Sequence, residues 1–212
     1  KIKSVFLNKK SAEKIVPVLS SIDFSRALFC DSDAFVDIDA LLGSFKDSLE
    51  VQGVKVFLGE TVKSITKKGD DFYVRTNKQV VATKRIVNAS GAWASVLSKM
   101  ARASVIPLKA YRRHLFISEP GRHDMSHWPF VWNVSKEYYF RPIDGDLMLS
   151  PCDKELERMT GFDLPKEKVD VEARKLLFKK IGHLQEAFGP ICIKEAKSGL
   201  RTMAPDGRFV IC

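Results

Sequence analysis

An arginine near the end of the chain has the setting best suited to chemistry. Arg201 follows Gly199 and Leu200 and precedes the turn signal Pro205-Asp206-Gly207, so it lies between apolar, strand-like stretches. A guanidinium between two half-buried strands is either a structural ion-pair partner or a fork that holds a carboxylate, because its planar donors match that anion in a bidentate way. Most arginines are solvated surface residues, so the rest of the chain must decide between these alternatives.

The second candidate is a turn of small residues, Ala89, Ser90, Gly91 and Ala92. They leave the backbone bare where a helix is expected to begin, and free N–H groups at a helix start suit an anion such as a phosphate. An ordinary tight strand-to-helix turn is the alternative. The sequence contains no G-x-G triplet, so the dinucleotide fingerprint that opens a Rossmann unit is missing, and these residues would hold such a cofactor only in part.

Other catalytic constellations do not occur in the sequence. The four cysteines lie far apart and form no C-x-x-C pair, which argues against a zinc site or a dense disulfide framework and fits a reducing, cytoplasmic compartment. We find no paired carboxylates and no Ser/His/Asp arrangement. Of the four histidines, only His114, beside Arg113, could approach Arg201. A structural role for His114 is the alternative.

The chain is basic, with a formal net charge of +9 and a pI near 9.4. Such a charge admits an anionic partner, nucleic acid included, but the Lys and Arg residues are spread along the sequence without a charged tail. This spread favours a solvated surface over a nucleic-acid interface. The sequence has no apolar run of membrane-spanning length, and its N-terminus is too briefly apolar for a signal peptide.

The first half of the chain has the alternating pattern of an α/β unit. The amphipathic spacing of Leu41, Phe45 and Leu49 behind Asp37 as N-cap predicts a helix packed on a core. The other elements expected here are a short helix over 11–22 interrupted at Pro17, a strand over 54–58, an antiparallel meander over 61–66, 72–76 and 80–82, a buried strand over 85–89 and a helix over 92–101.

The second half is richer in strands. Leu177, Ile181 and Leu184 on one face predict a helix over 171–188, and alternation along a strand places Arg112 on the opposite side from Arg113. The expected strands cover 111–118, 130–134, 138–140, 147–150, 191–196 and 209–211, with a polar loop over 154–168. The fold class is therefore α/β (α+β), with a mostly antiparallel sheet covered by helix.

Several motifs, in their order and spacing, resemble the D-amino-acid oxidase superfamily of FAD-dependent oxidoreductases, with the glycine oxidase and D-arginine dehydrogenase branch nearest. They are 87–94, Pro107, Tyr139-Phe140-Arg141-Pro142, Gly199-Leu200-Arg201 and Pro205-Asp206-Gly207. The resemblance implies a partial FAD-binding domain over 1–105, a substrate-binding sheet over 106–198 and a return strand over 199–212. It also implies an internal fragment that lacks the family's N-terminal dinucleotide-binding motif and its C-terminal flavin-binding segment.

The resemblance also assigns roles to residues. Arg201 would bind the substrate carboxylate, joined by Tyr139 and Arg113, and Phe130 and Trp132 would line the substrate pocket, with His114 at its edge. Trp132 departs from that branch, where a smaller residue stands, so the indole would reshape the pocket. The residues expected beside FAD are Val62, Ala89, Ser90, Gly91, Trp93, Gly199 and Leu200.

The implied activity is the oxidation of the Cα–N bond of a D-amino acid or related amine by hydride transfer to the flavin. Because the flavin carries the redox chemistry, the protein needs only to hold the substrate with its Cα–H directed at the ring. The fragment alone is expected to be inactive. The alternative is a catalytically inactive binding module with a basic surface for an anionic partner; it predicts salt-sensitive retention on nucleic acid or heparin.

Overall fold

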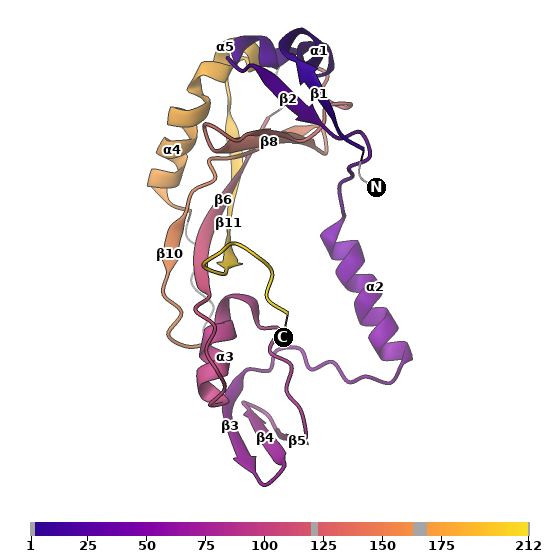
Figure 1. Cartoon of the computed structure of the whole chain (residues 1–212), viewed down its shortest axis with the longest axis vertical. Helices are drawn as coiled ribbons and strands as arrows, with labels where there is room; N and C mark the ends of the chain where they lie inside the picture. Colours follow the sequence, from indigo (N-terminus) through magenta and orange to yellow (C-terminus); the bar gives the residue numbers. More distant parts are fainter. Residues whose placement is uncertain (1–2, 120–122, 163–168, 212) are drawn as a thin grey trace.

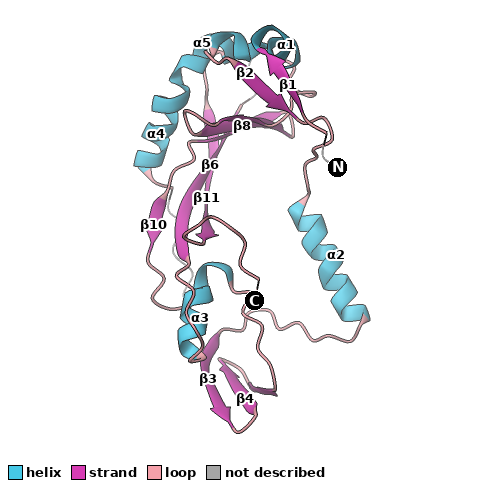
Figure 2. Cartoon of the chain, viewed as in Figure 1, coloured by secondary structure: helices cyan, strands magenta, loops and turns pink. Residues whose placement is uncertain are grey.

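A computed structural model describes residues 3–119, 123–162 and 169–211. These residues form antiparallel sheets of two, six and three strands together with helices (Figures 1 and 2). This mixture confirms the predicted α/β (α+β) class. Among the described residues, no helix is long and apolar enough to cross a membrane.

The six-stranded sheet is organised around one long strand, β6 (Lys109–Ser118). One edge of β6 pairs along its whole length with β11 (Ile193–Met203), and the other edge pairs with β10 and with β9. The order continues from β9 to β8 and then to β7. The remaining bounds are β7 (Val131–Asn133), β8 (Tyr138–Ile143), β9 (Asp146–Ser150) and β10 (Glu155–Glu157).

Strand alternation gives this sheet two different faces. Along β6, Ala110, Arg112, His114, Phe116 and Ser118 are buried, and the residues between them are less buried or exposed. Successive side chains of a strand point to opposite sides. The even-numbered residues of β6 therefore face the core, which confirms the prediction that Arg112 and Arg113 point in opposite directions.

The core lies between the buried face of the sheet and a layer of helices. Phe116, Phe140, Leu177, Ile181 and Leu184 have no exposed surface and belong to one apolar cluster. The helix predicted over 171–188 is present, divided at Gly182 into α4 (Val171–Ile181), η3 (Gly182–Leu184) and α5 (Gln185–Phe188). Figure 1 shows α4 alongside the sheet. The predicted apolar face, with Leu177, Ile181 and Leu184, is the buried one.

The N-terminal residues close one end of the same core. Ala12, Val16 and Val18 are buried in the cluster that contains Phe116 and Phe140. The helix predicted over 11–22 with a break at Pro17 is present as α1 (Lys9–Ile15) and η1 (Pro17–Ser21), next to the hairpin of β1 (Val5–Asn8) and β2 (Arg26–Phe29). The core therefore joins parts of the chain that the predicted division at residue 105 separates; that division stays a prediction.

The predicted meander and the helix after it are present. The meander consists of β3 (Val62–Lys68), β4 (Asp71–Thr76) and β5 (Val80–Thr83), paired antiparallel in that order. The helix expected over 92–101 starts as η2 (Gly91–Trp93) and continues as α3 (Ala94–Met100). Figure 1 shows the meander at the opposite end of the molecule from β8.

The helix behind Asp37 forms where predicted but does not pack on a core. In α2 (Ile38–Val51), the Asp37 carboxylate accepts a hydrogen bond from the Ala40 N–H at 2.9 Å, so the predicted N-cap is confirmed. None of the residues of α2 is buried, and Phe45 is 59% exposed. Periodicity shows which face of a helix is apolar, whereas a second element must be present to cover that face. The prediction of core packing was therefore wrong.

Three predicted strands are not strands in the structure. Residues 54–58, 85–89 and 209–211 have no ladder pairing, and Val87 is 88% exposed. A strand persists only where a neighbour satisfies its backbone N–H and C=O groups, and the described residues supply no such neighbour there. The strand predicted over 191–196 is longer than expected, since β11 runs on to Met203 and includes Arg201. In the loop expected over 154–168, Glu155–Glu157 form β10, and residues 163–168 lie outside the described residues.

Candidate functional site

The three residues predicted to bind a carboxylate lie on the same face of the sheet. Residues directly opposite in a ladder share a face, and the register places Arg201 opposite Tyr111 and Arg113 opposite Gly199. The buried residue Phe116 is three positions from Arg113, and Phe140 is one position from Tyr139, so Arg113 and Tyr139 both point away from the core. Arg201, Arg113 and Tyr139 thus share the face that the helices of the core do not cover.

The two arginines on this face are close neighbours. Arg113 and Arg201 are related diagonally across β6 and β11, which puts their Cα atoms about 7–8 Å apart. Arg201 is exposed, and among the described residues its guanidinium has no hydrogen-bond or ion-pair partner. The Nη1 group of Arg113 donates to the carbonyl oxygen of Asp153, and its buried Nε finds no acceptor in the same part of the chain. This pair therefore keeps donors available to an anion.

Gly199 leaves the backbone of β11 exposed beside these guanidinium groups. It lies opposite Arg113 and is exposed, and a Cβ built on it would meet no atom within 4 Å. The backbone of β11 can therefore be approached closely at this position. A methyl group here would fit the chain itself, so the fold does not require glycine at this position.

The aromatic residues predicted for the substrate pocket also lie together. Trp132 is opposite Tyr139 in the ladder between β7 and β8, and the rings of Phe130 and Tyr139 are 5.0 Å apart between centroids. Phe130 and Trp132 are 42% and 58% exposed. On a flat sheet Tyr139 is two strands from Arg113 and two residues further along, about 12 Å between Cα atoms. Over this span the ends of an arginine and a tyrosine side chain are within reach of each other.

Two predicted site residues point to the other face. His114 is fully buried on the core side of β6. Leu200 lies opposite Arg112 and is therefore on that side as well. Since neighbouring residues of a strand alternate, His114 cannot share the face of Arg113 and does not line the predicted pocket. This placement favours the structural alternative for His114.

Arg112 is the structural arginine of this strand. Its Nη2 and Nε donate to one carboxylate oxygen of Glu157 at 2.8 and 3.2 Å, and its Nη1 donates to the Ser198 hydroxyl at 3.1 Å. The side chain of Arg112 is 7% exposed and that of Glu157 is 27% exposed. A buried guanidinium must be paired in this way, because desolvation of an unpaired charge is costly. Arg112 ties three strands together on the core side.

Sequence reasoning missed two further residues of the open face. Tyr111 stands directly opposite Arg201. Arg141, two residues beyond Tyr139 on β8, places its guanidinium 4.6 Å from the ring centroid of Phe35, in the segment before α2. The alternation of residues 111 and 113, and of 139 and 141, was the available signal for both.

The turn predicted to lie beside the cofactor is held by an asparagine. The Asn88 amide donates to the Ala94 carbonyl at 2.9 Å and to the Ser98 hydroxyl at 3.0 Å, and its oxygen accepts from the Ser90 hydroxyl at 2.7 Å. Gly91 has φ of 54°, a left-handed conformation that favours glycine. The turn is thus built locally and keeps its backbone bare at Gly91.

The candidate cofactor residues extend from the meander to the sheet. η2 lies against β11, which brings the turn over 89–93 close to the strand that carries Gly199. Trp93 adds a buried Nε1–H with no acceptor among the described residues, and an unmet buried donor costs about 1–3 kcal/mol unless something accepts from it. Val62 is half-buried at the start of β3. The open Gly91 and Gly199 backbones and this unmet donor fit an elongated, acceptor-rich group such as FAD.

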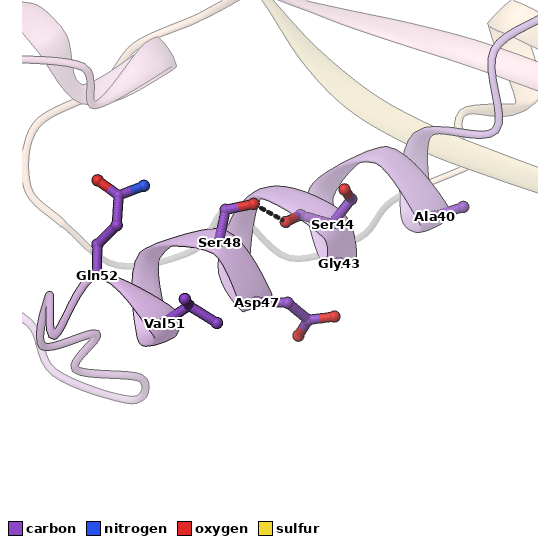
Figure 3. Close-up of a pocket in the computed structure, with 7 residues that line it drawn as sticks. All are labelled: Ala40, Gly43, Ser44, Asp47, Ser48, Val51 and Gln52. Carbon is purple, nitrogen blue, oxygen red and sulfur yellow. Dashed lines mark hydrogen bonds between the residues drawn. The ribbon is translucent and has the colours of Figure 1, made fainter.

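A surface hollow lies away from these residues. It runs along α2 and is lined by small and polar residues of that helix, where the Ser48 hydroxyl donates to the Ser44 carbonyl (Figure 3). A hollow lined by one helix has no second wall to enclose a ligand, and none of the predicted site residues borders it. The residues that line it are Ala40, Gly43, Ser44, Asp47, Ser48, Val51 and Gln52.

Burial affects two titratable groups near the sheet. Burial raises the pKa of the Cys152 thiol, against a smaller opposing effect of the Arg113 charge. Burial also raises the pKa of Tyr138, on the core side, while a hydrogen bond from Asn133 opposes that rise. These directions hold the thiol and the phenol neutral at pH 7. Neither group supplies a general base to the open face.

Comparisons with known proteins identify the family and the fold of the chain. Residues 2–212 match the model of the family DAO, described as FAD dependent oxidoreductase. Among solved structures, L-proline dehydrogenase from P. horikoshii matches with a TM-score of 0.80 at 20% identity, over 97% of this chain and 54% of that one. Glycine oxidase from Geobacillus kaustophilus gives 0.75 at 18%, over 98% and 53%.

A third solved structure contains the cofactor. L-alpha-glycerophosphate oxidase from Mycoplasma pneumoniae, dithionite reduced with FAD bound, matches with a TM-score of 0.76 at 17% identity, over 95% of this chain and 53% of that one. At these identities the structural matches show the fold. The chain spans about half the length of the solved structures that it matches.

Proposed function

Because the chain belongs to the DAO family of FAD-dependent oxidoreductases, we propose that it contributes the substrate-binding face of an enzyme that oxidises the Cα–N bond of an amino acid or related amine. The observation that carries this proposal is the shared face of Arg201, Arg113 and Tyr139 beside the open Gly199 backbone. Two guanidinium groups and a phenol on one face suit an amino-acid carboxylate. A D-amino acid is the substrate that the resemblance favours.

Each residue of this face has a physical task in the proposed reaction. Arg113 and Arg201 hold the carboxylate, and Tyr139 with Phe130 and Trp132 bounds the side-chain space. The exposed indole of Trp132 narrows that space, which favours a small or flat side chain. Fixing the carboxylate at one end orients the Cα–H of the substrate, and orientation of this kind accounts for much of the rate in such reactions.

The proposed reaction balances without a protein acid or base. FAD, when bound, accepts the hydride that leaves Cα. The amine binds neutral and loses its N–H proton to water as the C=N bond of an imine forms. By the register this face carries two carboxylates, Glu195 opposite Ile117 and Asp146 opposite Ile143. Both form ion pairs with lysines, Lys197 and Lys194, so the two arginines can attract the anionic end of the substrate. The 212-residue chain alone is proposed to be inactive.

A reduction assay tests this function. The product of the complete reading frame, loaded with FAD, is mixed without oxygen with D- and L-forms of small amino acids, and loss of flavin absorbance is followed. Amino acids are expected to reduce the flavin of the wild type. Arg201→Leu is expected to weaken the apparent substrate affinity about a hundredfold, since it removes two charge-assisted hydrogen bonds. Arg75→Leu, at an exposed position of β4, serves as the control. Equal behaviour of the two variants would refute the assignment of Arg201.

The alternative function also has one observation in its favour. A shallow basic hollow on the α4 side is lined by Lys136, Lys179, Lys180 and His183. However, the Lys180 ammonium already donates to the carbonyls of Glu137 and Pro151, at 2.8 and 2.7 Å. A binding module built on this hollow predicts retention on heparin that salt abolishes. It also predicts no effect of Arg201→Leu on any ligand.

A further inference from the structure

The strand paired with one edge of β6 changes beside Arg113 and His114. β10 pairs with β6 up to Arg112, and β9 pairs with it from Phe116 onward. The segment 151–154, which connects β9 to β10, passes Arg113 and His114 without strand pairing. Backbone groups at such a break need other partners. The Asp153 side chain accepts from the His114 N–H, and the Ser150 hydroxyl of β9 donates to the His114 carbonyl at 2.9 Å.

Asp153 fills the break from the core side. Its carboxylate accepts from the His114 backbone N–H at 3.0 Å and pairs with the His114 Nδ1 at 2.6 Å. Because the Nε2 of His114 accepts from the Asp170 N–H at 3.2 Å, the ring proton is assigned to Nδ1, which donates to Asp153. The side chains are 0% and 8% exposed. A buried, charge-assisted bond of this length fixes the position of Asp153.

The same residue contacts the site face through its backbone. The carbonyl oxygen of Asp153 accepts from the Nη1 group of Arg113. Nε and Nη2 then form the remaining edge of the guanidinium, and the buried Nε has no acceptor among the described residues. Because the buried Nε is closed to solvent, Nη2 is the nitrogen of Arg113 left to donate to an anion. Asp153 therefore connects a buried histidine on one face of β6 to an arginine on the other.

We propose that Asp153, anchored by His114, is a positioning residue that orients the guanidinium of Arg113 so that its Nη2 group is presented to the substrate carboxylate. This inference rests on the proposed function for the identity of the carboxylate. Its structural part, the orientation of Arg113, does not depend on turnover. The role is one of positioning because Asp153 acts through Arg113.

The orientation of Arg113 is tested by NMR on the chain itself. The arginine Nε–H signals are recorded, and that of Arg113 is identified by its loss in Arg113→Lys. The wild type is expected to show a slowly exchanging Arg113 signal. Asp153→Asn and Asp153→Ala are expected to move this signal and speed its exchange about tenfold or more, because both remove the charge-assisted bond to His114.

A matched control separates positioning from general loosening of the sheet. Glu157→Gln weakens the ion pair of the neighbouring Arg112 on the core face. It should move the Arg112 signal and leave that of Arg113 in place. Circular dichroism identifies any variant that fails to fold, and Asp153→Asn is retained as the conservative replacement. An unchanged Arg113 signal in folded Asp153→Asn and Asp153→Ala would overturn the proposal.

The link to the carboxylate is tested in the FAD-loaded product of the complete reading frame. Asp153→Asn is expected to raise KM about tenfold for an amino acid and to leave KM unchanged for the amine that lacks only the carboxylate. Combined with Arg113→Leu, its effect should vanish, since residues that act through one another are not additive. Equal effects on both substrates, or additive effects, count against positioning. A wild type that oxidises no amine refutes the proposed function, and the NMR arm still decides the orientation of Arg113.

Discussion

Replacing each of two arginines of the same sheet by leucine separates the structural charge from the binding charge. Arg112→Leu removes three hydrogen bonds on the core face, two to Glu157 and one to Ser198. Arg201→Leu removes a guanidinium with no partner among the described residues. Leucine retains apolar contact area at both positions, so the difference between the variants reports on the charge.

The expected magnitudes follow from burial. Removal of one member of a buried ion pair costs about 3–5 kcal/mol, because the other charge is left uncompensated. Water still reaches the Glu157 side chain, which is 27% exposed, so we expect Arg112→Leu to lower the free energy of unfolding by about 2–3 kcal/mol. Arg201→Leu should change it by less than about 0.5 kcal/mol, as is usual for exposed positions.

Urea unfolding of the chain, followed by fluorescence and circular dichroism, measures both values. The double variant Arg112→Leu/Glu157→Leu provides the internal check, since replacing both charges by apolar groups should restore much of the stability lost in Arg112→Leu. Loss of more than about 1 kcal/mol in Arg201→Leu would show that this guanidinium supports the fold. That result, or a neutral Arg112→Leu, would refute the division of roles between the two faces.

Three further outcomes are expected. Leu177→Ala, at a fully buried position of α4, should lower the free energy of unfolding by about 2–5 kcal/mol in urea titrations; a neutral result would contradict the packing of α4. Burial lowers the pKa of His183 below its usual 6.5, so the unfolded chain binds the proton more readily. The stability contributed by the neutral imidazole is fully present above that pH and is lost as the pH falls through the pKa of His183 in the folded chain. The free energy of unfolding, measured between about pH 7 and 5, should therefore depend less steeply on pH in His183→Gln than in the wild type. Phe45→Gln, 59% exposed on α2, should leave stability unchanged within about 0.5 kcal/mol and reduce binding of an apolar dye; a large stability loss would show that α2 is packed.

Features set by local periodicity could be predicted from the sequence. The alternation of Arg112 and Arg113, the apolar face of the helix over 171–188 and the Asp37 cap each depend on residues a few positions apart. The shared face of Arg113 and Arg201 needed more, because it depends on the register between β6 and β11. The order of motifs in the resemblance predicted that Arg113 and Arg201 bind one carboxylate together, and the register places both on one face.

What the sequence could not provide was the contact partner of each pattern. The apolar stripe of α2 and the β-branched runs at 54–58 and 85–89 have the composition of buried elements, yet the described residues do not bury them. Likewise, the pairing of His114 with Asp153 joins residues 39 positions apart, a separation that carries no periodic signal. A local sequence pattern indicates which residues of a segment can be buried, whereas contacts with distant segments determine whether they are buried.

The register of β6 therefore determines which residues can act. Arg112, Arg113 and His114 are consecutive, and only Arg113 reaches the open face. A slip of one residue would exchange the two arginines, bury Arg113 without Glu157 and bring His114 to the site. Phe116 opposite Leu149 in the core opposes such a slip from one end, and the bonds of Asp153 to His114 and Arg113 oppose it from the middle. The same contacts that fix the strand thus select the arginine that is available to a carboxylate.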